Sequence, residues 1–194
     1  CQVNADRRKN TAKNHTCTHL LHRVLKDILG DHVNQAGSYV SQDRLRFDYT
    51  HFEAVDRETL KEIERRVNEA ILADYKVSTD VMNIEEAKKS GATALFDEKY
   101  DETVRVVSVD DFSRELCGGT HIDETAKIGM FKIISEGSIA SGVRRIEAVT
   151  GRAAINYLRE ISGITEELSA AMKVSRDELL DKVNSLKKEV KDKD

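Results

Sequence analysis

Two short groups of metal-ligand residues stand far apart in this chain. His15 and His19 are four residues apart, and the same interval separates Cys117 from His121. On a helix, residues four apart lie on one face about one turn along, so the first two imidazoles can bind one ion. A thiolate and a third imidazole give three nitrogens and one sulfur, a donor set that suits Zn²⁺ in tetrahedral coordination. The spacing therefore predicts a zinc site assembled from two distant segments.

Two glycines, Gly118 and Gly119, follow directly after Cys117. Glycine adopts backbone conformations that are closed to other residues, so this pair lets the chain fold tightly and turn both flanking side chains inward. We expect both glycines to lie where a substrate would bind.

His22 competes for the same ion, because it follows His19 by three residues. His15 and His22 are separated by about 10 Å of helix at roughly 1.5 Å per residue, so at most two of the three histidines can be ligands. The spacing slightly favours His15 with His19 over His19 with His22, and His22 then packs nearby or supports a ligand.

The threonines and the cysteine between the two histidines have different expected roles. Cys17 lies about 200° around the helix from His15, which predicts a small core residue and not a nucleophile. Thr16 either contributes a hydroxyl to catalysis or bonds back to the preceding turn.

The metal itself has two possible roles. Four protein ligands are typical of a structural site, whereas a loosely held Cys117 or His121 would leave a position for water or substrate and predict a hydrolase.

Composition bounds the class of protein. The chain has 194 residues, 39% hydrophobic and 34% charged, with a net charge of −4. These values predict one soluble domain with at most an appendage, and no apolar run is long enough for a membrane span. Three cysteines predict a reducing, cytoplasmic setting. The start at Cys1, without an apolar signal core, indicates a fragment of a longer protein. A nucleic-acid partner would have to be bound by local basic patches.

The elements that must position the ligands follow from periodicity. A helix is expected from about Asp6 to Leu29, with Gly30 as its end, and a second helix is expected after the capping residue Asp56. Residues 37–41 and 45–49 form a predicted hairpin, and a short helix is predicted at 85–89. Further strands are predicted at 76–82, 104–109, 129–135 and 143–149. Because helices and strands do not alternate regularly, the expected class is α+β, with a largely antiparallel sheet and the ligand helix packed across it.

The last part of the chain differs from the rest. Strand patterns stop after Gly151, and apolar residues then recur at spacings of four, three and four in a highly charged segment. We predict a domain of residues 1–162 followed by a helical linker or short coiled coil of residues 163–194, through which the chain could self-associate.

Five motifs together resemble the editing domain of alanyl-tRNA synthetases. In order they are Asn14-His-Thr-Cys-Thr-His-Leu-Leu-His22, Gln35-Ala-Gly-Ser38, Arg44-Leu-Arg-Phe-Asp48, Glu115-Leu-Cys-Gly-Gly-Thr-His121 and Gly142-Val-Arg-Arg-Ile-Glu147. The resemblance covers about Ala5 to Gly163. Threonyl-tRNA synthetases and freestanding editing proteins share the two ligand pairs, but the Gly-Gly-Thr segment is closer to the alanyl type. Cys17 departs from the small residue that the family commonly has there.

The resemblance implies hydrolysis of the ester between serine or glycine and tRNA for alanine. It implies that His15, His19, Cys117 and His121 bind zinc and that Gln35 is a catalytic pocket residue, affecting activity and amino-acid choice. The alternative for Gln35 is a surface residue at the start of the first strand. The domain that uses ATP to charge tRNA is absent from this chain. Candidate tRNA contacts are the basic residues Arg7, Arg8, Lys9 and Lys13 and the pair Arg144-Arg145. On a strand, Arg144 and Arg145 point to opposite faces, so only one of the two can face the site. Two alternatives stay open, a freestanding editing factor and a tRNA-binding module whose zinc is only structural.

Overall fold

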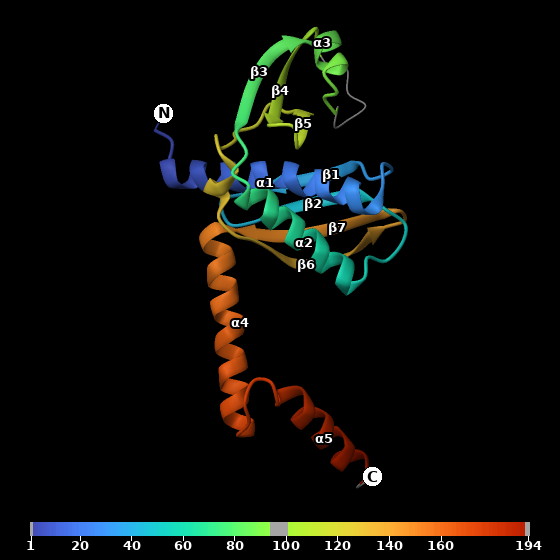
Figure 1. Ribbon diagram of the computed structural model, residues 1–194, viewed down its shortest axis with the longest axis vertical. Coiled ribbons are helices and arrows are strands. Elements are labelled where there is room, and N and C mark those ends of the chain that lie inside the picture. Colours follow the sequence, from blue (N-terminus) through green and yellow to red (C-terminus); the bar gives the residue numbers. More distant parts are fainter. Residues whose placement is uncertain (1, 94–100, 193–194) are drawn as a thin grey trace. The chain divides into compact units, whose positions relative to one another are not determined.

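The computed structural model describes residues 2–93 and 101–192 of the chain. They form two compact units, residues 1–154 and 155–194. The first unit contains two antiparallel sheets, one with four strands and one with three, together with helices that pack on them (Figure 1). The predicted α+β class is confirmed, including the antiparallel pairing and the packed helices. The described strands divide between two sheets, and the three strands between residues 77 and 116 form the smaller one.

Helix α1 (Ala5–Leu29) is the ligand-bearing helix. It begins where the Asn4 side chain accepts a hydrogen bond of 2.9 Å from the Arg7 amide. It ends at Gly30, whose φ of 114° favours glycine and whose amide donates to the Lys26 carbonyl over 2.9 Å. Both ends agree with the sequence prediction to within a residue.

The four-stranded sheet supports α1. Its strand order is β1 (Gln35–Val40), β2 (Leu45–Thr50), β7 (Val143–Thr150) and β6 (Phe131–Ala140), with every neighbouring pair antiparallel. Helix α1 packs against β1, β2 and β7, and α2 (Arg57–Leu72) packs against α1 and β6. As predicted, Asp56 caps α2 by accepting a 2.7 Å bond from the Thr59 amide.

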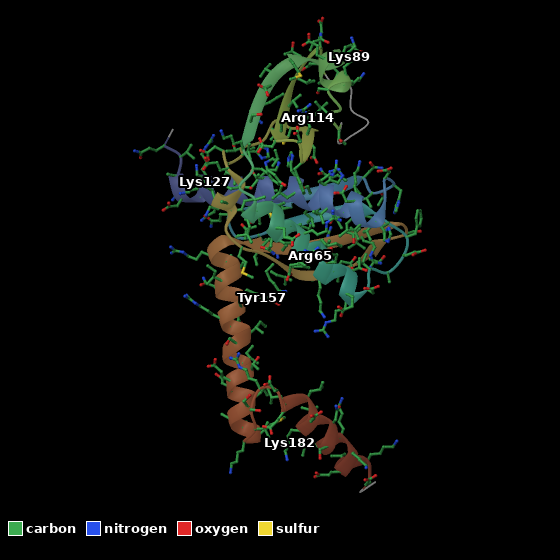
Figure 2. All side chains as sticks on the ribbon, viewed as in Figure 1. Arg65, Lys89, Arg114, Lys127, Tyr157 and Lys182 are labelled. Atoms are coloured by element: carbon green, nitrogen blue, oxygen red, sulfur yellow. The ribbon has the colours of Figure 1, made fainter. Side chains whose placement is uncertain are left out.

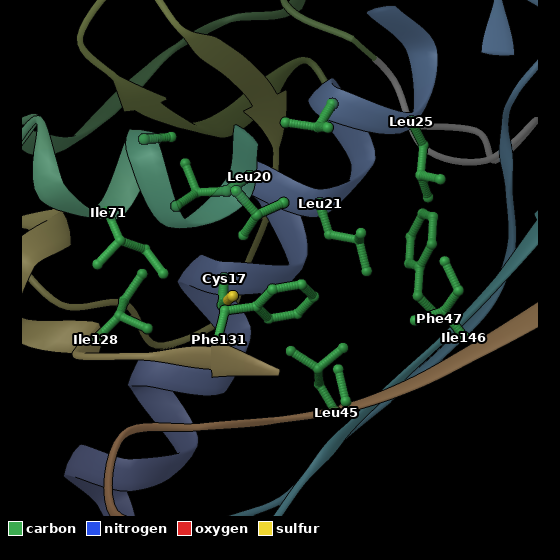
Figure 3. Packing of buried hydrophobic residues seen from close by; sticks show 14 of the residues in the cluster. Cys17, Leu20, Leu21, Leu25, Leu45, Phe47, Ile71, Ile128, Phe131 and Ile146 are labelled. Carbon is green, nitrogen blue, oxygen red and sulfur yellow. The ribbon is translucent and has the colours of Figure 1, made fainter. Parts of the chain in front are cut away.

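The main hydrophobic core lies between this sheet and the two helices (Figure 3). Leu20 and Leu21 of α1 meet Phe47 of β2 and Phe131 of β6, and all four side chains are fully buried. Cys17 lies in the same cluster with no exposed surface, which confirms its predicted core position. Burying side chains of this size contributes roughly 1.5–3 kcal/mol each, so this core fixes the position of α1.

The second sheet is smaller. It consists of β3 (Val77–Asn83), β4 (Thr103–Val109) and β5 (Ser113–Leu116), and α3 (Ile84–Lys89) packs on it. Local sequence patterns predict β3, α3 and β4 but not β5, because Ser-Arg-Glu-Leu has only one apolar residue. A short 3-10 helix, η1 (Thr125–Ile128), precedes β6.

The second unit is helical. Helix α4 (Gly151–Met172) begins at the end of the first unit, and α5 (Leu179–Lys191) follows it. The turn between them is held by Arg176, which donates hydrogen bonds of 2.7 Å to Ser162 and Glu166. The predicted C-terminal helical extension is confirmed. Helix α4 continues through residue 163, so the division at 162 and the coiled coil stay predictions. Within the described ranges, no helix combines the length and apolar character needed to cross a membrane.

Candidate metal centre

Four side chains from two distant segments meet beside α1. His15 and His19 project from the helix, and Cys117 and His121 come from the loop after β5. One donor atom from each residue lies within 4.8 Å of the others. The Cys117 Sγ atom is 3.4 Å from His15 Nε2 and 3.3 Å from His121 Nε2. The group contains His15 and His19 but not His22, in agreement with the limit that helix geometry sets.

Each imidazole of the cluster also lies close to a polar group outside it. His121 Nδ1 lies 3.1 Å from the Thr16 hydroxyl, and His15 has a hydrogen bond to the backbone of Thr120. His19 Nδ1 is buried 3.2 Å from a carboxylate oxygen of Glu115, although the alignment falls short of a hydrogen bond. An acceptor beside Nδ1, such as the Glu115 carboxylate next to His19, favours the tautomer that carries its proton on Nδ1 and leaves Nε2 free to bind an ion.

Glu115 places a negative charge behind the ligands. Its other carboxylate oxygen accepts a 2.9 Å hydrogen bond from His22 Nδ1. Burial alone raises the pKa of this carboxyl, but the adjacent His19 and His22 outweigh burial and leave the pKa below its usual value. Glu115 is therefore ionised and orients both histidines. This role of Glu115 was not predicted, yet the period-two alternation of a strand places Glu115 on the same side of the chain as Cys117.

The loop from Cys117 to His121 is fixed by Arg105 of β4. The Arg105 guanidinium donates to the Cys117 carbonyl over 2.7 Å and to the Gly119 carbonyl over 2.6 Å. A Cβ atom on Gly119 would lie 1.9 Å from His15 Cε1, so only glycine fits there. The space beside Gly118 is open. No local pattern marks Arg105, because its partners lie on the loop twelve or more residues further along the chain.

The protonation states suit a cation site. Burial lowers the pKa of His15 to about 4 and also lowers the pKa values of His19 and His121. The three imidazoles are therefore neutral near pH 7, which is the form that binds metal ions. Burial raises the pKa of the Cys117 thiol, so metal binding there would release a proton. Three neutral imidazoles and one thiol with supported orientations fit a zinc ion.

The other predicted site residues lie in several places. The Thr16 hydroxyl is fully buried, and besides its contact with His121 it accepts a 3.3 Å bond from the Ile122 amide. Gln35 is half-buried at the start of β1, opposite Tyr49 of β2. Among the described residues, the contacts of the four ligand side chains involve Thr16 but not Gln35.

The basic residues predicted to contact tRNA lie in different environments. Arg144 is buried in the four-stranded sheet, where its guanidinium donates to Glu136 over 2.5 and 2.8 Å. Arg7 and Arg8 are exposed on the first turns of α1. Lys13 is half-buried near Gly151, and burial, then Lys9 and Arg152, lower its pKa. Arg7 and Arg8 are thus better placed than Arg144 to meet phosphates.

Known proteins resemble this chain in sequence. Residues 104–147, which include Cys117 and His121, match the family described as the threonyl and alanyl tRNA synthetase second additional domain. The chain is 54% identical over 189 residues to an alanine–tRNA ligase of Clostridioides difficile (strain 630), covering 97% of this chain and 22% of that protein. It is 53% identical over 193 residues to one of Thermoanaerobacter sp. (strain X514) and 49% identical over 193 residues to one of Petrotoga mobilis. Each match covers all of this chain and 22% of the relative.

The chain thus spans about a fifth of the length of these relatives. The resemblance predicted from the motifs is confirmed. Over nearly its whole length, the chain corresponds to the segment of alanine–tRNA ligases that contains the second additional domain shared with threonyl tRNA synthetases.

Proposed function

We propose that this chain is a zinc-dependent editing hydrolase. It cleaves the ester that joins a wrong amino acid, serine or glycine, to tRNA specific for alanine in the cytoplasm. The observation that supports this best is the cluster of His15, His19, Cys117 and His121 within a segment similar to alanine–tRNA ligases. A pocket made for alanine rejects glycine or serine only by a modest factor, so a separate hydrolytic site has a clear purpose.

The side chains have distinct tasks in this proposal. His15, His19, Cys117 and His121 hold the ion, which supplies Lewis-acid polarisation of the ester or of a water molecule when bound. Glu115 and the Thr16 hydroxyl orient two of the imidazoles. Gln35 contributes to the amino-acid pocket, and Arg7, Arg8 and Lys13 contact tRNA. The loop amides at Gly118 and Gly119 lie beside Cys117, where the substrate ester would bind.

A second candidate is a tRNA-binding module in which zinc is only structural. It is favoured by the number of protein donors, because four protein ligands are typical of closed structural sites. The two candidates differ in what the metal cluster does and not in the partner.

Deacylation of seryl-tRNA for alanine tests the hydrolase. Zinc-loaded chain should release serine well above the rate in buffer and should leave correctly charged alanyl-tRNA largely intact. No release above buffer, with zinc bound and the tRNA intact, would contradict the proposal. Cys117→Ala distinguishes the two roles of zinc: a folded but inactive variant indicates catalysis, and loss of the fold indicates a structural site.

Whether the segment acts within a whole ligase or alone is a separate part of the proposal. We favour the ligase, because the matches extend through α4 and α5 and cover 97–100% of the chain. Immunoblotting of cell extracts with an antibody against α5 tests this, since a ligase predicts one band several times larger than 21.9 kDa.

A further inference from the structure

A polar groove runs along the first turns of α1. It has a volume of about 550 Å³ and lies between the helix and the turn that joins β1 to β2. Arg7 and Thr11 form its helical side, and Tyr39, Ser41 and Arg44 belong to the hairpin. None of these residues is among the four of the metal cluster.

The groove has the charges that bind phosphates. Arg7 is exposed, and the Arg44 side chain is 56% exposed with a loose 3.4 Å contact to Glu147. Asp43 is the acidic residue of the lining, so the lining contains two guanidinium groups and one carboxylate. Guanidinium groups donate in pairs to phosphate oxygens, and their exposure leaves donors available to a ligand.

The groove also has an aromatic surface. Tyr39 is 51% exposed, although large apolar side chains in this unit are mostly buried. The guanidinium carbon of Arg46 lies 6.0 Å from the centre of the Tyr39 ring, which holds one side of the ring in a cation–π arrangement. An exposed aromatic ring among arginines is the combination with which proteins stack the bases of single-stranded nucleic acid.

The groove is adjacent to the metal cluster through α1. Arg7, Thr11 and His15 follow one another at intervals of four, so they lie along one row of the helix. About 6 Å of helix separates Thr11 from His15. Asn14 fixes the hairpin turn to this part of the helix, since its amide donates to the Ser41 carbonyl over 2.9 Å and accepts from Thr150 over 2.7 Å.

From these observations we propose that the groove binds the single-stranded nucleotides that immediately precede the esterified 3′-terminal nucleotide. Arg7 and Arg44 contact their phosphates, and Tyr39 stacks on a base. This inference deepens the proposed function and rests on it, because the ester must lie at the cluster formed by His15 and its partners.

Binding of a short RNA tests the groove. The probe is a fluorescently labelled single-stranded tetranucleotide, ACCA, and fluorescence anisotropy gives its Kd for the zinc-loaded chain. Tyr39→Ala should weaken binding about tenfold, whereas Tyr39→Phe, which keeps the ring, should stay within about twofold. Arg7→Gln and Arg44→Gln should each weaken binding and reduce its salt dependence by about one ion.

Arg65→Gln is the matched control. Arg65 is an exposed arginine of α2 (Figure 2), ion-paired with Glu62 and Glu69. The Arg65→Gln variant should bind the probe with the same Kd as the unchanged chain. Equal Kd values for the unchanged chain, Tyr39→Ala and the two arginine variants would overturn the groove, as would tighter binding of a four-base-pair duplex.

The two proposals fail separately. If the chain deacylates seryl-tRNA but the groove variants bind ACCA normally, the groove is wrong and the hydrolase stands. If ACCA binding depends on Tyr39 and the arginines but no ester is cleaved, the RNA site stands and the hydrolase is wrong.

Discussion

The two sheets of the first unit differ in how they are stabilised. The four-stranded sheet shares a large core with α1 and α2, including the fully buried Phe47 and Phe131. Beside the three-stranded sheet, a separate and smaller cluster consists of the buried residues Ala87, Val104, Val106 and Leu116, whereas Val109 of β4 belongs to the large core. Small domains with little apolar burial often depend on metal ions for their stability. The small sheet therefore needs its attachment to α1 more than the large sheet does.

The metal cluster is part of that attachment. His15 and His19 belong to the helix fixed by the large core, whereas Cys117 and His121 follow directly after the small sheet. Glu115 of β5 adds contacts to His19 and His22 of the same helix. An ion held by all four ligands would join a rigid part of the molecule to a less stable one. The following predictions test this difference.

The largest effect is expected from the core of the large sheet. Phe47→Ala should lower the free energy of unfolding by about 3–5 kcal/mol, because it removes a fully buried aromatic ring and leaves a cavity. Urea denaturation followed by circular dichroism measures the loss. The matched pair is Leu45→Ala in the large core and Leu116→Ala in the small core, two buried leucines, and the second change should cost clearly less. Equal losses would contradict the proposed difference between the sheets.

Metal removal should act mainly on the three-stranded sheet and the loop that follows it. A ligand present at a hundred times its Kd adds about 2.7 kcal/mol of stability, so chelation should remove an effect of this order. Hydrogen exchange measured with and without a chelator locates it. We expect faster exchange in β4, β5 and residues 117–121, and little change in β2 and β7. Uniform acceleration across both sheets would show that the ion stabilises the whole unit.

A smaller effect is expected from the residue that supports the ligands. Glu115→Gln should weaken zinc binding about 10- to 100-fold, because a neutral amide cannot match the carboxylate between His19 and His22. Competition with a chromogenic chelator gives the affinity. Glu136→Gln is the control, since Glu136 is an equally buried carboxylate that pairs with Arg144 in the large sheet. An unchanged zinc affinity in Glu115→Gln would mean that the carboxylate does not position the ligands.

Much of the fold follows from local patterns. The limits of α1, the β1–β2 hairpin, the Asp56 cap and most strands agree with prediction, because periodicity and capping act over a few residues. The strand β5 was missed, since its residues are mostly polar and become strand only by pairing with β4. The division into two sheets was also missed, because strand partners are chosen by contacts between distant segments.

The sequence by itself predicted the four residues of the cluster. Donor types and helical spacing left two pairs of histidines open, and the resemblance to the editing domain implied His15 with His19. Only the tertiary structure decided what surrounds the cluster. Arg105, Glu115 and the groove residue Tyr39 gain their positions from pairing between strands and from the packing of α1. Arg144 shows the same limit, because its ion pair with Glu136 forms across two strands. The spacing of residues along the chain predicts which side chains can bind the same ion. The burial of a side chain and its charged partners depend on distant segments that come together only when the chain folds.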